Sequence, residues 1–264
     1  MPPDLPFQPS SNTPSGGPAS ARAPGPGRRA AALNARFRHH GATAVLEAVL
    51  GARAAGRVAL VSSFGAESVV LLHLAAMVDR SVPVLFIDTG KLFTETLVYQ
   101  HELAERLGLR DIRIIGPDAA RAASQDPSGT LHRSDPDACC ALRKTAPLSA
   151  ALVGFDGWLT GRKRFQGGRR ATVEFFEAEP GIDRIKINPL AHWTPQDIRT
   201  YMDENRLPRH PLVARGYPSI GCAPCTTPAR SGEDPRAGRW RGLGKTECGL
   251  HLGTARRHRK GESA

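Results

Sequence analysis

The sequence has no apolar stretch long enough to cross a membrane. Its longest apolar runs, residues 68–78 and 82–87, are far shorter than the about 20 residues that a membrane-spanning helix needs. The chain also begins with prolines rather than with a continuous apolar segment, so we expect no signal peptide. The sequence therefore predicts a cytoplasmic protein with no membrane partner.

Aromatic residues are few, at 6% of the chain, and we find no internal repeat. Proteins that bind single-stranded nucleic acid usually place aromatic side chains on a basic surface, where the bases stack on them. The scarcity of such side chains argues against a nucleic-acid partner, so we expect none.

Basic residues, in contrast, are abundant. Lys and Arg number 36 against 25 Asp and Glu, which gives a net charge of +11 and an isoelectric point near 10.1. A surplus of this size suggests an anionic partner such as a nucleotide, a sulfate or a phosphate. With 264 residues, the chain can bury one good core, or form one domain with appendages.

We divide the chain into three parts. Residues 1–29 are rich in Pro, Gly, Ser and Ala and lack apolar periodicity, so we expect a disordered tail, with an organelle transit peptide as the alternative. Residues 30–237 are expected to form the folded domain, although they become loop-like after about residue 207. Residues 238–264 form a separate C-terminal segment.

Within the folded part, runs typical of strands alternate with runs of helical spacing. Strands are predicted at 58–62, 82–88, 112–115, 157–160 and 184–187, and helices at 42–50, 66–78, 94–107 and within 135–153. A further helix should begin after Thr194, an N-cap residue, with Pro195 at its first position. This alternation predicts an α/β fold with a mostly parallel sheet covered on both faces.

Polar loops follow three of these strands. Residues 62–68 join a strand to a helix, so their backbone N–H groups and serine hydroxyls form a candidate anion seat. Residues 88–91 end the neighbouring strand at the same sheet edge, although Asp88 alone is equally suited to a turn. Residues 161–170 combine glycines with several cations, which suits phosphate or sulfate oxygens but also a solvated basic loop.

Five cysteines are present, and four of them are grouped as an adjacent pair, Cys139 and Cys140, and a C-x-x-C, Cys222 and Cys225. Four thiolates can hold zinc or a 4Fe–4S cluster. Adjacent cysteines do not form the knuckle that structural zinc sites use, so the pattern favours the cluster over zinc, with unligated buried cysteines as the remaining alternative. Lys144, one helical turn after Cys140, is placed to face such a cluster.

The fifth cysteine, Cys248, has no metal partner and lies among glycines and cations, close to Lys245 and His251. Cationic neighbours favour the thiolate, which is the nucleophilic form. Gly244 and Gly249 give the segment the freedom to move. We therefore expect Cys248 to be the catalytic nucleophile of an enzyme that attacks an anionic substrate.

Seven segments together give the chain a specific resemblance. They are SSFGAES at 62–68, IDTGKLFTET at 87–96, CCALRKTAPL at 139–148, TGRKR at 160–164, KINPLAHWT at 186–194, GYPSIGCAPCT at 216–226 and KTECGLH at 245–251. In this order they closely resemble the assimilatory adenylyl-sulfate reductases, within the family that also reduces phosphoadenylyl sulfate. The resemblance implies an adenine nucleotide α-hydrolase-like (PP-loop-like) α/β fold with a mobile C-terminal segment.

The resemblance also implies a reaction and its partners. Cys248 would attack the sulfur of adenylyl sulfate and release AMP, and thioredoxin or glutaredoxin, as a separate protein, would release sulfite from the S-sulfocysteine. Members with the four grouped cysteines carry a 4Fe–4S cluster and generally use adenylyl sulfate rather than its 3′-phosphorylated form. The sequence leaves a homo-oligomer open. The implied substrate-binding residues are Ser62, Ser63, Phe64, Gly65, Asp88, Lys144, Gly161, Arg162, Arg164, Arg239 and Arg241.

Two other functions compete with this interpretation. An ATP-dependent tRNA thiolase would suit the positive charge, but its nucleotide loop typically reads Ser-Gly-Gly-x-Asp-Ser, whereas Phe64 and Glu67 stand in that segment here. Such an enzyme would also leave Cys248 without a role. A zinc-stabilised RNA-binding protein is the second alternative, and the few aromatics disfavour it.

Overall fold

The fold is built on a six-stranded sheet in the order β3-β2-β1-β4-β6-β5. The computed structural model describes residues 24–243, 245, 247 and 249–251. Every strand pair is parallel except β5 with β6, so the prediction of a mostly parallel α/β sheet is confirmed. The strands are β1 Val58–Ser62, β2 Val84–Ile87, β3 Ile112–Ile115, β4 Gly157–Leu159, β5 Phe176–Ala178 and β6 Ile185–Ile187.

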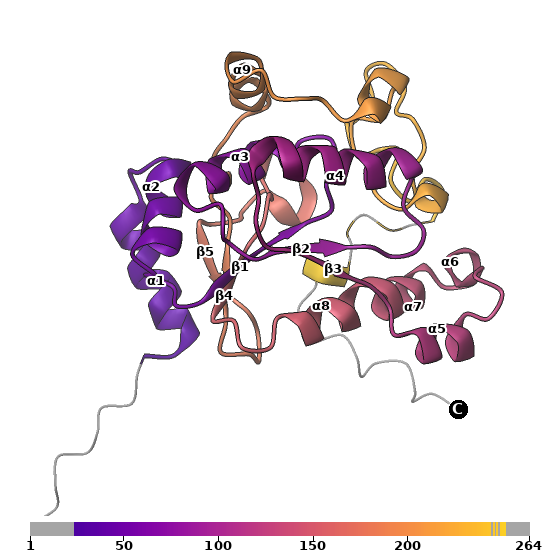
Figure 1. The fold of residues 1–264 in the computed structure, drawn as a ribbon, viewed down its shortest axis with the longest axis horizontal. Coiled ribbons are helices and arrows are strands. Elements are labelled where there is room, and N and C mark those ends of the chain that lie inside the picture. Colours follow the sequence, from indigo (N-terminus) through magenta and orange to yellow (C-terminus); the bar gives the residue numbers. More distant parts are fainter. Residues whose placement is uncertain (1–23, 244, 246, 248, 252–264) are drawn as a thin grey trace, which may run out of the picture.

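Helices lie on both sides of this sheet (Figure 1). On the side that is uppermost in Figure 1 lie α3 and α4, with α9 beyond them, while α1 and α2 stand at one end of the sheet. On the lower side lie α5 to α8. The bounds are α1 Pro26–Phe37, α2 Ala42–Leu46, α3 Ser68–Val78, α4 Thr94–Leu107, α5 Ala119–Gln125, α6 Leu131–Ser134, α7 Pro136–Cys140, α8 Ala146–Ala151 and α9 Pro195–Glu204.

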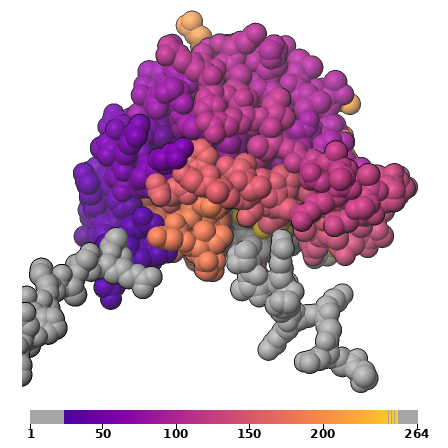
Figure 2. Space-filling view, turned by 60° about the horizontal axis from the view of Figure 1, so that its bottom comes forward, coloured from indigo at the N-terminus to yellow at the C-terminus, as the bar shows by residue number. Residues whose placement is uncertain are grey.

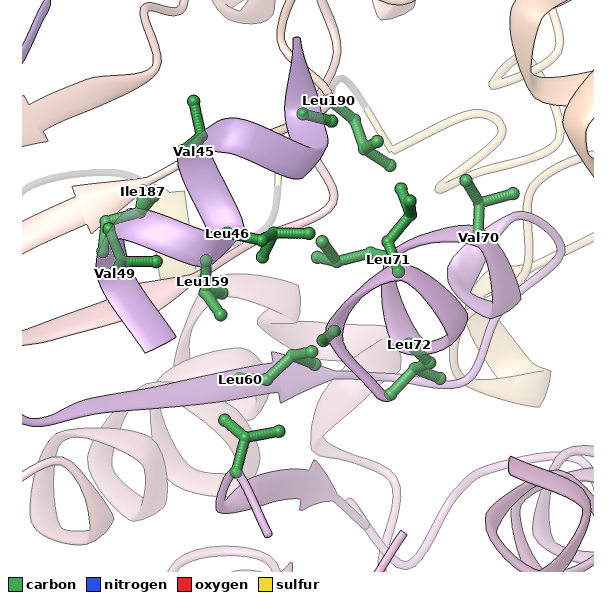
Figure 3. Packing of buried hydrophobic residues seen from close by; sticks show 14 of the residues in the cluster. Val45, Leu46, Val49, Leu60, Val70, Leu71, Leu72, Leu159, Ile187 and Leu190 are labelled. Atoms are coloured by element: carbon green, nitrogen blue, oxygen red, sulfur yellow. The ribbon is translucent and has the colours of Figure 1, made fainter. Parts of the chain in front are cut away.

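The main core fills the upper layer. Side chains from the α2 region, α3 and the sheet point toward one another there, as Figure 3 shows for Leu46, Leu60, Leu72 and Leu159. Helix α3 is apolar on nearly its whole surface and buries seven residues, which explains why the run 66–78 reads as almost uniformly hydrophobic. A smaller cluster on the lower side joins α8 to the sheet through Leu148, Leu152 and Trp158.

The helix that carries the cysteine pair is continuous but not uniform. Asp135 caps α7 by accepting hydrogen bonds from the backbone N–H groups of residues 137 and 138, and α7 runs through a π-helical segment, Ala141–Thr145, into α8. The helix predicted within 135–153 is therefore confirmed. The π segment adds a wider turn just after Cys140, as π turns often do at functional sites.

The structure corrects the boundary of the N-terminal part. Helix α1 begins at Pro26, so residues 26–29 are helical and not part of a disordered tail, while residues 1–23 lie outside the described range. The helix buries Ala30 and Phe37, and Asn34 exchanges hydrogen bonds with the backbone of Phe176 in β5. Its stability therefore depends on a strand about 140 positions away, which no local pattern indicates.

Among the described residues, none of the helices combines the length and the apolar character that crossing a membrane requires.

Candidate functional site

A cavity opens at the carboxyl ends of β1 and β4, where nucleotide-binding α/β proteins place their ligands. We call it the central cavity. Three groups of residues form its walls: the loop after β1, the loop after β4, and the segments 218–220 and 234–239. Of the residues predicted to bind substrate, it is lined by Ser62, Ser63, Gly65, Gly161, Arg162 and Arg239.

The loop after β1 is anchored by Phe64. The Phe64 side chain is fully buried and packs edge-on against Phe86 at 5.2 Å between ring centroids. Its backbone has a φ of 47°, which is strained for a bulky residue, and the Ser62 hydroxyl accepts a hydrogen bond from its N–H at 3.1 Å. The expectation that Phe64 contacts substrate is therefore wrong for its side chain, which instead fixes the loop that presents Ser63 and Gly65 to the cavity.

Asp88 has the turn role that the sequence left open. Its carboxylate accepts a hydrogen bond from the backbone N–H of Gly90 at 2.8 Å, and Gly90 has a φ of 67° that glycine tolerates. The neighbouring Ile87, and not Asp88, lines the central cavity. The structure therefore does not bring the Asp88 side chain to the site.

Arg162 and Arg164, two cations of the loop after β4, point in different directions. Arg162 is buried and lines the central cavity, and its guanidinium pairs with Glu177 and donates to Asn188 Oδ1 at 3.2 Å. Arg164 turns away from the cavity, since it donates to the Val173 carbonyl at 2.8 Å and pairs with Glu174 at 2.6 Å. Arg164 therefore does not line the central cavity in this structure, and its contact with substrate stays a prediction.

Lys163 is a site residue that the sequence analysis missed. It lines the central cavity, is almost completely buried, and its Nζ lies 2.6 Å from Oε2 of Glu67 in the loop after β1. Burial lowers the pKa of Lys163, and the Glu67 carboxylate opposes that effect. The pair fastens the two loops of the cavity together. The two residues are 96 positions apart, so no spacing rule could have paired them.

Arg170 and Arg236 form a cationic wall with Glu247. Arg170 donates to both Glu247 carboxylate oxygens, at 2.6 and 2.8 Å, and Arg236 lies 3.5 Å from the same carboxylate. Both arginines line the central cavity, and all three residues line a smaller cavity beside it, the connecting cavity. Burial lowers the pKa of Arg236 to about 10, with the Arg170 charge as the second cause.

Arg241, in contrast, is exposed and pairs with Glu233 at 2.7 Å. The prediction placed it near the substrate, but it does not line the central cavity in this structure.

The four grouped cysteines line one cavity, the cysteine cavity. Cys139, Cys140 and Cys222 are buried and Cys225 is half-buried. Burial and then the neighbouring Cys222 raise the pKa of Cys139, which indicates how near the thiols lie. Within the described ranges, no group of three or more His, Cys, Asp or Glu residues is arranged to hold a single metal ion. The structure therefore shows that the four thiols line one common cavity.

Lys144 connects the cysteine cavity to the rest of the site. It lines both the cysteine cavity and the connecting cavity, as Trp240 also does. The lining of the connecting cavity includes four cations, Lys144, Arg170, Arg236 and Arg239, with Glu247 as the one carboxylate among its described residues. The result is a strongly positive region between the strand ends and the cysteines.

Arg143 holds the cysteine helix against the end of α5 and against the loop after β2. Arg143 donates to Asp126 Oδ2 at 2.8 and 3.2 Å and to the Thr89 carbonyl at 3.1 Å. The Thr89 hydroxyl in turn lies 3.2 Å from the Cys222 sulfur. Two cysteine-bearing segments that are about 80 positions apart in sequence are thereby joined through the Thr89 loop. Apart from the proximity of Arg143 to the cysteine pair, no local pattern indicated this network.

Cys248, the predicted nucleophile, lies outside the described residues, and so does the side chain of His251. The described residues around them are in contact with the site. Lys245 pairs with Asp137 beside the cysteines, Glu247 pairs with Arg170, and Leu250 lines the central cavity. Residues 245, 247 and 250 therefore lie along the cationic region.

Comparison with known proteins agrees with this geometry. Residues 57–228 match the phosphoadenosine phosphosulfate reductase domain. The chain is 51% identical over 221 residues to the adenosine 5′-phosphosulfate reductase of Chelativorans sp., covering 83% of this chain and 89% of that protein. It is 43% identical over 190 residues to adenosine 5′-phosphosulfate reductase 1 of Bacillus subtilis, covering 72% and 82%.

Among solved structures, the phosphoadenylyl-sulfate reductase of Candida auris, in a phosphate complex, aligns with a TM-score of 0.65 and 25% identity. The alignment covers 75% of this chain and 96% of that one, which confirms the predicted PP-loop-like fold. The family match also removes the tRNA thiolase and the RNA-binding protein as alternatives. The chain belongs to the phosphoadenosine phosphosulfate reductase family.

Proposed function

We propose that the chain reduces adenylyl sulfate to sulfite and AMP, using electrons from a separate dithiol protein such as thioredoxin or glutaredoxin. One observation carries the proposal: a region lined by four cations lies between the cavity at the strand ends and a cavity lined by four cysteines. A nucleotide in the central cavity can direct its phosphosulfate into this region, where Arg and Lys favour sulfate and phosphate oxygens.

The reaction consists of two displacements at sulfur. The Cys248 thiolate attacks the sulfate sulfur, the bond from that sulfur to the bridging oxygen breaks, and AMP leaves with the electron pair. A thiolate of the dithiol protein then attacks the Cys248 sulfur of the S-sulfocysteine and expels sulfite, and its second thiol completes a disulfide. The two electrons that reduce the sulfur therefore come from the dithiol. Lys144, Arg170, Arg236 and Arg239 stabilise the charge that develops on the departing phosphate.

The four-cysteine cavity fits a 4Fe–4S cluster. Each iron of such a cluster takes one thiolate, so four thiols that line one cavity can supply its ligands, and the adjacent pair does not form the knuckle of structural zinc sites. Cys139, Cys140, Cys222 and Cys225 would hold it, and Lys144 would face it. When bound, it supplies a fixed iron–sulfur charge beside the cationic region and need not change its redox state. The grouped cysteines also support adenylyl sulfate as the preferred substrate.

The decisive experiment measures products without ATP. The protein is purified without oxygen and incubated with adenylyl sulfate, thioredoxin, thioredoxin reductase and NADPH, and AMP and sulfite are quantified. We expect equal amounts of both, slower turnover with phosphoadenylyl sulfate, and no product with Cys248→Ser. A strict requirement for ATP, or AMP without sulfite, would contradict the proposal.

A further inference from the structure

The lower face of the sheet is only partly covered by helices. Helix α8 packs against β2 and β3 there, and Leu148 and Leu152 bury Trp158 of β4. Lys186 of β6 is the register partner of Trp158 on one side and of Glu177 on the other. Register partners point to the same face of a sheet, so Trp158, Lys186 and Glu177 form a row across β4, β6 and β5 on this face. Figure 2 shows this side of the molecule, with the salmon and orange surface between the N-terminal helices and the α5–α8 segment.

A cavity lies over this row, separate from the central cavity. We call it the lower cavity. It is lined by Thr145, Leu148, Ser149, Leu152, Trp158, Arg162, Glu177, Ala178, Glu179, Pro180, Ile182, Arg184, Lys186, Gly249 and Leu250. Three of these residues, Trp158, Arg162 and Leu250, also line the central cavity. One wall therefore divides the two cavities, and the resemblance to nucleotide-binding relatives assigns no role to the lower one.

Lys186 lines the lower cavity and lies against Trp158. The residue is 8% exposed, and its Nζ lies 4.7 Å from the centre of the Trp158 ring. In the part of the chain that the structure describes, Nζ has no hydrogen-bond acceptor and no carboxylate within ion-pair distance. The ammonium therefore has donors left for an anion that enters the lower cavity.

The two carboxylates of the lower cavity are already engaged. Glu177 pairs with Arg162 and accepts from Asn188 Nδ2 at 2.9 Å. Glu179 accepts from Trp158 Nε1 at 3.0 Å and from Arg184 Nη1 at 3.4 Å. Arg162 and Arg184 are thereby neutralised in pairs, and Lys186 is the cation left over. Burial, followed by the Arg162 charge, lowers the pKa of Lys186 to about 8, and the carboxylates of Glu179 and Glu177 oppose that effect.

We propose that the lower cavity binds a small inorganic oxyanion at Lys186, of the class that includes sulfite, sulfate and phosphate. An ammonium offers three donors to such an anion. Apolar walls at Leu148, Leu152 and Ile182 limit the space around it. Because the lower cavity shares a wall with the central cavity, an anion released from the nucleotide site has a second binding place next to it. The site goes beyond the proposed reaction and requires no turnover.

The test follows the indole N–H signal of Trp158 by NMR in the full-length protein saturated with AMP. The chain has three tryptophans, so Trp158→Phe assigns the signal. Sodium sulfite, sulfate and phosphate are titrated separately at constant ionic strength against chloride. We expect a saturable shift of the Trp158 signal, with a half-saturation concentration at least about ten-fold higher in Lys186→Met and near the wild-type value in Lys186→Arg. The order of the three oxyanions identifies the preferred one.

Two controls separate this site from the central cavity. Arg170→Met removes a cation of the central cavity and should leave the Trp158 titration unchanged. Lys186→Met keeps the side-chain volume and removes a buried charge, so this variant should melt at or above the wild-type temperature. If Lys186→Met melts below the wild type, Lys186→Gln is used in the titration instead. Three outcomes would overturn the proposal. The Trp158 signal could shift no more with the oxyanions than with chloride, the half-saturation concentration could be equal in the wild type and in both uncharged variants, or the shift could be lost in Arg170→Met. None of these outcomes depends on whether adenylyl sulfate is the substrate.

Discussion

Glu247 is bound to Arg170 through two hydrogen bonds, with Nε and Nη2 of Arg170 at 2.6 and 2.8 Å from its two carboxylate oxygens. Both side chains are buried, at 12% and 7% exposure. A bidentate pair of this kind is strong and directional. It joins the residue that precedes Cys248 to the cationic wall of the central cavity.

We therefore predict that Glu247→Gln loosens the C-terminal segment. The variant loses one charge of a buried pair, which typically costs about 3–5 kcal/mol when one partner is removed. Trypsin should cleave after Arg241 and Lys245 faster than in the wild type, and sulfite formation should fall at least about ten-fold, by the conversion of 1.4 kcal/mol per decade. Glu233→Gln is the matched control, because its pair with Arg241 is exposed. Equal cleavage and turnover in the two variants would show that the pair does not hold the segment.

The second prediction concerns the covalent intermediate. Incubation with adenylyl sulfate and no reductant should add a sulfonate group to Cys248, detected by intact mass and removed by thioredoxin. Cys248→Ser should bind nucleotide and keep its iron but form no adduct. Sulfite production at the wild-type rate by this variant would assign the nucleophile elsewhere.

The third prediction concerns the cysteine cavity. Serine at any one of Cys139, Cys140, Cys222 or Cys225 should remove iron, labile sulfide and the brown iron–sulfur absorbance together with activity. Cys248→Ser should retain all the iron, which makes it the control for general oxidative damage. Stoichiometric zinc with full activity and no iron would rule out the cluster.

The fourth prediction separates cations that line the cavity from a cation that does not. In a Cys248→Ser background, Arg236→Ala should weaken adenylyl sulfate binding by about 1.5–3 kcal/mol, the range for a hydrogen bond to a charged group. Arg164→Ala should change it by less than about 1 kcal/mol, because that residue pairs with Glu174 at the surface. Calorimetric titration measures both. A large loss in Arg164→Ala alone would mean that Arg164 turns toward bound substrate.

The fifth prediction is a pH dependence of stability that comes from His210. This residue is buried, its Nδ1 accepts from the Leu212 N–H at 3.2 Å, and its Nε2 lies 3.1 Å from the Thr96 hydroxyl. Burial lowers its pKa from 6.5 to about 4. As the pH falls from 6.5 to 4, the unfolded chain therefore binds a proton that the folded chain does not, and the free energy of unfolding decreases by at most about 3 kcal/mol.

Urea unfolding at pH 7.5, 6 and 5 measures this dependence. In His210→Gln the slope between pH 6.5 and 5 should be smaller than in the wild type, whatever the loss of stability at pH 7.5. His101→Gln, at an exposed position of α4, should keep the wild-type slope. An unchanged slope in His210→Gln would place the titrating group elsewhere.

Local patterns predicted the framework of the fold well. The bounds of β1, α4 and β3 agree with the structure residue for residue, and Thr194 caps α9 as expected. These elements have clear periodicity or clear end signals. The sequence missed α1 and β5, because α1 is fastened by the Asn34–Phe176 contacts and β5 has only three residues. Such elements owe their stability to tertiary contacts rather than to local propensity.

The sequence indicated some residues of the candidate site and not others. The motif segments placed Ser63, Gly161 and Lys144 in the cavity linings. Membership of a motif did not reveal which way a side chain points. Phe64 and Arg164 were both expected at the substrate, whereas the Phe64 side chain lies in the core and Arg164 pairs with Glu174 near the surface. The pairs Glu67–Lys163 and Arg170–Glu247 join distant segments, and only the folded chain brings them together.

Leu250 borders both the central cavity and the lower cavity. The same side chain lines the central, connecting and lower cavities, and it packs on the lower apolar cluster with Trp158. Any ligand that displaces it alters all three spaces at once. A ligand that displaces Leu250 from one cavity changes the affinity for a ligand in the other, and the change is equal in both directions because the two binding equilibria share one free energy of coupling. A ligand that leaves Leu250 in place produces no such coupling, so the position of this one side chain decides whether the two cavities act independently.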